Sequence, residues 1–164
     1  MMADDMAAFI DALGLHKPFI AGWSDGGQIG LEMGMHYPDL ASAYVVGGAF
    51  YKFTEQYRQL ITELGIEGPN QLNAEAIEAN FGIWNAEIEA QALQLSVPFW
   101  TEPNYSAADF AKITSPTLIL LGDRDEAVPV EQAVEMYRQI PNAELAICAG
   151  ADHGLQADHA DIFN

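Results

Sequence analysis

The chain has 164 residues, of which 50% are hydrophobic, and its six basic and 24 acidic residues give a net charge of −18. This length fits one domain with its own core. A surface this negative repels phosphate backbones and anionic lipid, so it excludes nucleic acid and membrane surfaces as expected partners. Cys148 is the single cysteine, which rules out a disulfide within the chain and a cysteine-based metal site. With no basic leader and no apolar span, a cytoplasmic protein is expected.

Residues 1–49 predict an alternation of helices and short parallel strands. A helix with one apolar face comes first, because hydrophobic side chains recur at steps of three and four: Met6, Phe9, Ile10 and Leu13. The apolar runs 19–22 and 43–46 predict buried strands, and a helix that ends before Pro38 lies between them. This order is typical of a parallel sheet with crossover helices.

Residues 50–110 predict helices and no strand, which favours an inserted helical cap. One helix is expected over Thr54–Leu64, and a long one over Asn73–Leu95 with Asn73 as its N-cap. A stripe at steps of four, three and four runs along the longer helix: Ile77, Phe81, Trp84 and Ile88. The core of the domain is then expected to comprise residues 1–49 and 111–164.

The sheet pattern returns after Pro116. Strands are predicted over Thr117–Leu121 and Ala143–Cys148, and a helix over Val130–Ile140 with Val134 and Tyr137 facing inward. The fold class is therefore α/β, with a parallel sheet of about four strands and flanking helices.

A glycine-rich turn follows the first predicted strand, with the sequence Gly22-Trp23-Ser24-Asp25-Gly26-Gly27. A G-x-S-x-G motif between a buried strand and a helix indicates a nucleophile elbow, a turn so tight that glycines are needed two residues before and two after the serine. Ser24 is the predicted nucleophile. The backbone N–H of Asp25, at the start of the next helix, is the predicted donor to an oxyanion.

A serine needs a base, and the base needs an acid to orient it. His153 lies in the loop after the last predicted strand and is preferred over His159, while His16 and His36 are expected on the surface. The loop after the preceding strand offers two acids, Asp123 and Asp125. The order serine, acid, histidine is that of this type of site.

These segments resemble the α/β-hydrolase superfamily, in particular its small capped serine hydrolases: esterases, lactonases, cofactor-free haloperoxidases and meta-cleavage C–C hydrolases. The resemblance rests on Gly22–Gly27, Pro116–Pro129 and Gly150–His153. It implies that the second aspartate of the loop, Asp125, is the acid, and that Asp123 caps the loop or pairs with Arg124. It implies no cofactor and no metal.

The resemblance further implies hydrolysis of a small ester or lactone through an acyl-enzyme on Ser24. Aromatic side chains are expected to line the substrate pocket: Trp23, Trp84, Phe99, Trp100 and Tyr105. The alternatives are a C–C bond hydrolase with the same triad, a non-catalytic hydrolase-like binding or assembly protein, and a truncated fragment.

Members of this superfamily usually carry further strands before the first helix predicted here, with a loop that supplies a second oxyanion N–H. Their last helix also extends beyond the end of this chain. The strand 19–22 is then expected at an exposed sheet edge, which favours homodimerisation, strand exchange or low stability. We therefore expect a hydrolase core that is incomplete at both ends.

Overall fold

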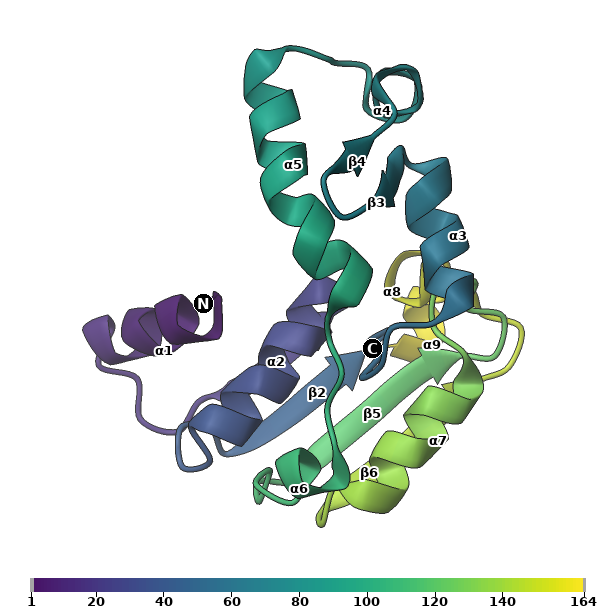
Figure 1. The fold of residues 1–164 in the computed structure, drawn as a ribbon. Helices are drawn as coiled ribbons and strands as arrows, with labels where there is room; N and C mark the ends of the chain where they lie inside the picture. Colours follow the sequence, from purple (N-terminus) through teal and green to yellow (C-terminus); the bar gives the residue numbers. More distant parts are fainter. Residues whose placement is uncertain (1, 164) are drawn as a thin grey trace. The chain divides into compact units, whose positions relative to one another are not determined.

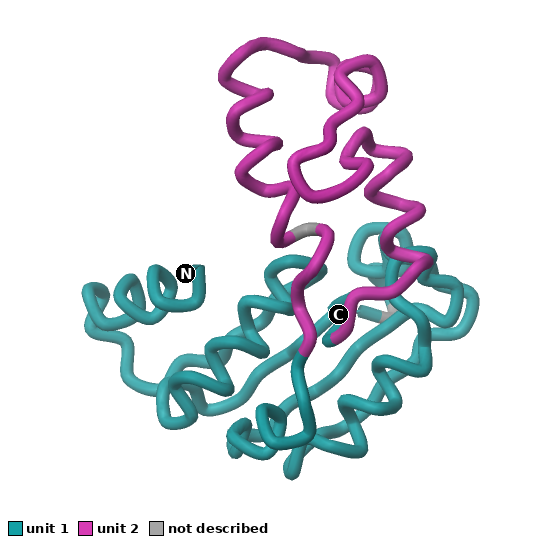
Figure 2. The backbone as a smooth tube through the Cα atoms, viewed as in Figure 1, with its two compact units in different colours: residues 1–51, 105–164 teal, residues 52–104 magenta. Residues whose placement is uncertain are grey.

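The computed structural model describes residues 2–163, apart from the side chains of Phe99 and Ile162. The chain forms two compact units (Figure 1). The first unit runs up to Tyr51 and from Tyr105 onward, and the second comprises Lys52–Asn104; Figure 2 draws them in teal and magenta. None of the helices in residues 2–163 combines the length and the apolar character that a membrane span needs.

The first unit is built on a parallel sheet of four strands in the order β1-β2-β5-β6. The strands are β1 (Phe19–Trp23), β2 (Ala43–Gly47), β5 (Thr117–Gly122) and β6 (Ala143–Cys148). The helices described in this unit are α1 (Met2–Ala12), α2 (Asp25–His36), α6 (Ala107–Phe110), α7 (Val130–Gln139), α8 (Leu155–Asp158) and α9 (Ala160–Phe163). The predicted α/β class with about four parallel strands is confirmed. Because parallel strands end at one edge, the loops after β1, β5 and β6 meet there.

Helices α2 and α7 cover one face of this sheet (Figure 1). The core on this face is made of fully buried aliphatic side chains: Leu31, Met33, Val46, Ile119, Leu121 and Met136. The prediction that Val134 and Tyr137 of α7 face inward is wrong, because a neighbouring face of the helix is the buried one. Ala133 and Met136 are buried, whereas Val134 is half-buried and Tyr137 is 44% exposed. The sheet is contacted by side chains one position earlier than predicted, at steps that continue to buried Ile140.

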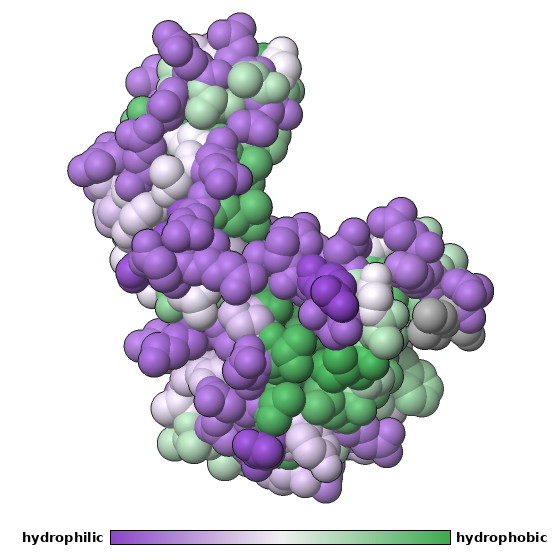
Figure 3. All heavy atoms as spheres, turned by 90° about the vertical axis from the view of Figure 1, so that its right-hand side faces the viewer, coloured by the Kyte–Doolittle hydropathy of each residue, from purple (hydrophilic) through white to green (hydrophobic). Residues whose placement is uncertain are grey.

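The opposite face of the sheet is only partly covered. Strand register puts Ala21 beside Val45, and Val45 beside Leu118, on this face. Ala21 is exposed, the other two are half-buried, and Phe19 on the same face is 83% exposed. Figure 3 shows hydrophobic side chains gathered on the unit that holds the sheet. Strand β1 is an edge strand of the described sheet, as expected, and the homodimer inferred from such an edge stays a prediction.

The predicted apolar face of α1 is buried only in part. Ile10 is buried, while Met6, Phe9 and Leu13 are exposed. The helix is held to the unit by α2 and by a hydrogen bond of 2.7 Å from the Tyr37 hydroxyl to Asp4. The sequence pattern therefore predicted the helix but not how much of its face is covered.

Tyr44 carries a buried hydroxyl without a hydrogen-bond partner among residues 2–163. The residue is 2% exposed, and burial raises the pKa of its phenol to about 12. A buried polar group that makes no hydrogen bond costs roughly 1–3 kcal/mol. We therefore expect Tyr44→Phe to raise the free energy of unfolding in urea by about 1 kcal/mol. Tyr137→Phe on the exposed side of α7 is the control and should change it by less than about 0.5 kcal/mol. A loss of stability in Tyr44→Phe would contradict the assignment.

The second unit holds three helices and a small hairpin within its described residues: α3 (Glu55–Glu63), β3 (Ile66–Gly68), β4 (Gln71–Leu72), α4 (Ala74–Phe81) and α5 (Ala86–Thr101). The predicted N-cap Asn73 is confirmed at the start of α4, and Thr54 caps α3 in a similar way. The Thr54 side chain accepts a hydrogen bond from the Tyr57 N–H, and the Asn73 side chain accepts one from Ala76. Each satisfies an N–H that has no partner inside its helix.

Two predictions for this segment are wrong. The expected single helix over Asn73–Leu95 is two helices, because Gly82 adopts a left-handed conformation (φ 72°) that ends α4. Asn85 then caps α5 by accepting hydrogen bonds from Glu87 and Ile88. The segment also contains strands, since β3 and β4 pair antiparallel.

The limits of this unit differ from the predicted insertion over residues 50–110. The rings of Tyr51 and Tyr105 both pack edge-on against Phe110, at centroid distances of 5.4 Å and 6.3 Å. Phe110 is fully buried, and these residues belong to the first unit, which is called the core unit below. Tyr105 also donates a hydrogen bond of 2.8 Å to Glu32 of α2. The role of the second unit as a cap stays a prediction.

Candidate active site

Ser24 lies in the turn between β1 and α2 with a strained backbone. Its dihedral angles are φ 55° and ψ −120°, and few residues other than glycine adopt a positive φ. Its N–H donates a hydrogen bond of 2.9 Å to Gly47 of the neighbouring strand, which anchors the turn to the sheet. Strain held in place by the surrounding structure is typical of a functional residue.

The turn requires glycine at two positions, but not both of those predicted. An ideal Cβ on Gly22 would lie 2.1 Å from the carbonyl oxygen of Gly26. One on Gly27 would lie 2.7 Å from the carbonyl oxygen of Gly47, whereas Gly26 has no atom within 4 Å of such a Cβ. The expectation of a required glycine two residues after the serine is therefore wrong. The crowded position is Gly27, where α2 meets β2.

His153 bridges Ser24 and Asp125 through its two ring nitrogens. Its Nε2 lies 3.0 Å from the Ser24 hydroxyl oxygen, and its Nδ1 lies 2.8 Å from a carboxylate oxygen of Asp125. Asp125 follows β5 and His153 follows β6, so the carboxyl edge of the sheet brings all three side chains together. An ionised carboxylate only accepts hydrogen bonds, so Nδ1 carries the proton and Nε2 is free to accept one from Ser24.

The Asp125 carboxylate is fixed by its surroundings. Its side chain is 0% exposed, and the oxygen that does not face His153 accepts hydrogen bonds from the N–H groups of Ala127 (2.9 Å) and Val128 (2.8 Å). The hydrogen bond from His153 to Asp125 is the main cause that raises the pKa of the imidazole above its usual value of 6.5. Burial acts in the opposite direction, and the charges of Asp125, Glu126 and Asp152 add to the rise.

The other predicted candidates do not join this cluster. Asp123 accepts a hydrogen bond of 2.5 Å from the Gly150 N–H and lies 3.7 Å from the Arg124 guanidinium, so it holds the loop. His16 and His36 are exposed, and His159 ends α8. Among residues 2–163, no group of three or more histidine, cysteine, aspartate and glutamate side chains is arranged to hold a metal ion.

Asp25 is the first residue of α2, directly after Ser24. The N–H groups of a first helical turn have no partner within the helix, and the helix dipole adds positive character there. The backbone at this position can therefore stabilise negative charge that develops on an atom bonded to Ser24.

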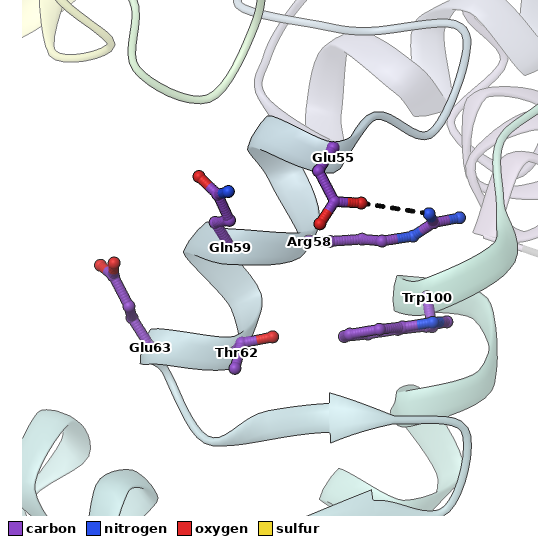
Figure 4. Close-up of a pocket in the computed structure, with 6 residues that line it drawn as sticks. All are labelled: Glu55, Arg58, Gln59, Thr62, Glu63 and Trp100. Carbon is purple, nitrogen blue, oxygen red and sulfur yellow. Dashed lines mark hydrogen bonds and ion pairs between the residues drawn. The ribbon is translucent and has the colours of Figure 1, made fainter.

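The predicted pocket residues are divided between the two units. Trp23 packs beneath the His153 loop, Tyr105 belongs to the core unit, and Trp84 is half-buried in the second unit. The side chain of Phe99 lies outside the described residues. Trp100 lines a pocket of about 350 Å³ within the second unit (Figure 4).

The residues that line the pocket with Trp100 are polar or charged, whereas an aromatic lining was expected. Helix α3 supplies its other lining residues: Glu55, Arg58, Gln59, Thr62 and Glu63. The Arg58 guanidinium lies over the Trp100 ring, 5.9 Å from its centroid, and makes a 3.3 Å ion pair with Glu55 (Figure 4). The Trp100 ring therefore makes a cation–π interaction with Arg58 of the same unit.

Gly47 at the end of β2 and Gly48 directly after it also shape the site and were not predicted to do so. Gly48 has φ 53°, and an ideal Cβ there would lie 3.1 Å from the His153 ring and 3.0 Å from that of Trp23. An ideal Cβ on Gly47 would lie only 2.1 Å from the Trp23 ring. The pair follows the predicted strand 43–46, and two consecutive glycines can mark a close approach to the backbone as well as the end of a strand.

Comparison with known proteins identifies the fold. The model of the alpha/beta hydrolase family matches residues 2–164. The chain belongs to the alpha/beta hydrolase family. Within the family, a 2-hydroxy-6-oxononadienedioate/2-hydroxy-6-oxononatrienedioate hydrolase of Pseudomonas sp. is 26% identical over 94% of this chain and 63% of its own length.

Solved structures of alpha/beta hydrolases share the arrangement. The meta-cleavage product hydrolase CumD of Pseudomonas fluorescens IP01 matches with a TM-score of 0.69 and 21% identity, over 98% of this chain and 66% of that one. Est816, described as an N-acyl homoserine lactone degrading enzyme, matches with a TM-score of 0.67 and 21% identity, over 99% and 70%. The chain thus spans about two thirds of the length of these family members.

Proposed function

We propose that the chain is a serine hydrolase that acts on a small ester or lactone through an acyl-enzyme. The observation that carries this proposal is the continuous hydrogen-bonded series from Ser24 through His153 to Asp125. A buried carboxylate, an imidazole with a raised pKa and a serine on a strained turn are the parts that nucleophilic acyl transfer requires.

Each residue has a defined task in this mechanism. His153 Nε2 takes the proton as Ser24 Oγ attacks the carbonyl carbon, and the Asp125 carboxylate stabilises the imidazolium that forms. The tetrahedral oxyanion is stabilised by the Asp25 N–H. His153 then gives its proton to the leaving oxygen and activates water to hydrolyse the acyl-enzyme.

The names of two relatives support different substrates. Est816 is described as a lactone-degrading enzyme, which favours the ester or lactone reading. CumD is a meta-cleavage product hydrolase, which favours the C–C bond hydrolase as the second candidate with the same three residues. A short-chain p-nitrophenyl ester, an N-acyl homoserine lactone and a meta-cleavage product, assayed side by side, discriminate between the two.

A fluorophosphonate probe tests the proposed nucleophile. We expect the probe to label the folded chain at Ser24, because the organophosphorus centre reacts only with a serine whose proton is removed by a base. Labelling should vanish in Ser24→Ala and His153→Ala, since loss of either group lowers turnover by about 10⁶-fold in serine proteases. His16→Ala, at an exposed histidine, is the control and should be labelled normally. Folded chain that resists the probe would support the non-catalytic alternative instead.

A further inference from the structure

Trp23 ends β1 and immediately precedes Ser24. Its neighbour across the strand pair is Gly47, and an ideal Cβ on Gly47 would come within 2.1 Å of the indole ring. The indole therefore lies directly against the Gly47 backbone, in space that a side chain at position 47 would fill. The ring also packs against the buried cluster formed by Leu120, Cys148, Ala151 and Leu155.

The same indole contacts His153 in two ways. Its Nε1–H donates a hydrogen bond of 3.0 Å to the His153 carbonyl oxygen, and the two rings lie 6.3 Å apart between centroids. Both rings approach Gly48, where an ideal Cβ would be 3.0 Å from the indole and 3.1 Å from the imidazole. The position of the imidazole is thus limited by the indole and by the Gly48 backbone.

The hydrogen bond from Trp23 is the shorter of the two that the structure shows for the main chain of His153. Its N–H lies 3.5 Å from a carboxylate oxygen of Glu126, which is long for a hydrogen bond, whereas the bond from Trp23 has ordinary length. His153 lies in a loop between β6 and α8, where no strand or helix fixes the backbone. The bond from Trp23 therefore ties this loop to the sheet at the residue that carries the imidazole.

We propose that Trp23 is a positioning residue, whose indole N–H holds the His153 main chain so that the imidazole spans Ser24 and Asp125. This inference rests on the proposed function and gives Trp23 a role other than the predicted substrate lining. Because Trp23 and Ser24 are consecutive, one strand end carries both the nucleophile and the anchor of its base.

Trp23→Phe tests the proposal, because it keeps an aromatic ring over Gly47 and removes only the N–H donor. We expect the rate of fluorophosphonate labelling to fall on the order of 10- to 100-fold, as small misplacements of a reacting group do, with kcat reduced and KM unchanged on an ester substrate. Phe163→Leu is the control, because it removes a ring that packs edge-on against the Trp23 ring at 5.9 Å but leaves the indole N–H donor on Trp23 itself. It should leave the labelling rate unchanged.

The pH profile separates positioning from a general loss of stability. The charged groups that raise the pKa of His153 are Asp125, Glu126 and Asp152, and all remain in Trp23→Phe. If the imidazole drifts from Asp125, its pKa falls toward about 6.5. Since the neutral imidazole is the base, the acid limb of the labelling profile then moves to lower pH. A variant that was only less stable would keep the wild-type limb.

NMR titration of His153 makes the two proposals separable, because it needs no activity. The titration is recorded in Ser24→Ala and in Ser24→Ala/Trp23→Phe, with the signal assigned by His153→Gln. A lower pKa in the double variant supports positioning even if the wild-type chain resists the probe. An unchanged pKa together with an unchanged labelling rate in Trp23→Phe overturns the positioning role, whatever the substrate.

A second measurement covers the case in which Trp23→Phe does not fold. In a Trp84→Phe/Trp100→Phe background Trp23 is the only tryptophan. Its fluorescence should be quenched as His153 gains a proton, because imidazolium quenches nearby indole, and His153→Gln should abolish the transition. Emission that does not titrate, or that titrates equally in His153→Gln, contradicts the contact on which the proposal depends.

Discussion

Asp125→Asn is expected to lower the turnover number by about 10⁴-fold, the loss that the same change causes in serine proteases. The surroundings of this carboxylate explain why the amide would be harmful. One oxygen accepts hydrogen bonds from the Ala127 and Val128 N–H groups, so an asparagine must keep its carbonyl oxygen there. The NH₂ group is then forced toward His153 Nδ1.

An NH₂ group facing Nδ1 fixes the wrong tautomer of the imidazole. Nδ1 must accept the amide hydrogen bond, so the ring proton moves to Nε2, which lies 3.0 Å from the Ser24 hydroxyl. A protonated Nε2 cannot take the serine proton. The asparagine side chain would keep the position of the Asp125 carboxylate, so the defect would appear in kcat and in the labelling rate.

Asp123→Asn is the matched control, because it makes the same chemical change two residues away. Asp123 accepts its hydrogen bond from the Gly150 N–H, and an asparagine oxygen can accept it equally. We expect labelling at nearly the wild-type rate. Steady-state kinetics on one ester compare kcat of the two variants. Similar losses of kcat at the two positions would contradict the proposed role of Asp125.

The residues of the candidate site could be predicted because each lies in a short segment with a strong local signal. Ser24 lies in a glycine-rich turn after a strand, and His153 lies in a loop after another. Parallel strands bring such loops to one edge whatever the distance between them along the chain. The choice of Asp125 over Asp123 did not follow from the residues alone, since both occupy one loop. It came from the resemblance to a family, and the geometry puts Asp125 against the imidazole.

Features that depend on packing between distant segments were missed. Nothing local to Trp23 indicates that its indole reaches a carbonyl 130 residues later. The rotation of α7 was wrong because Val134 and Tyr137 have the same spacing as Ala133 and Met136, and only the sheet decides which pair is covered. The break after Phe81 was overlooked although Gly82 and Asn85 are a stop signal and a cap, because the apolar stripe continues across them.

Gly22→Ala is expected to destabilise the core unit by at least about 3 kcal/mol, a large share of the 5–15 kcal/mol that holds a typical domain folded. The added methyl carbon would lie 2.1 Å from the Gly26 oxygen and 2.3 Å from the Gly26 carbonyl carbon, both backbone atoms. No side chain can rotate away to make room. Relief requires α2 to move away from β1, and Ser24 would move with it.

Gly26→Ala tests whether the loss of stability comes from the crowding at Gly22 or whether alanine is unfavourable anywhere in the turn. Its Cβ would meet no atom within 4 Å, and the residue is helical, where alanine is favoured over glycine by roughly 0.5–1 kcal/mol. We expect the free energy of unfolding in urea to fall in Gly22→Ala and to hold or rise in Gly26→Ala, with fluorophosphonate labelling lost only in the first. Equal destabilisation of both would mean that the elbow needs flexibility at each glycine, and that close backbone contact at Gly22 does not govern the position of Ser24.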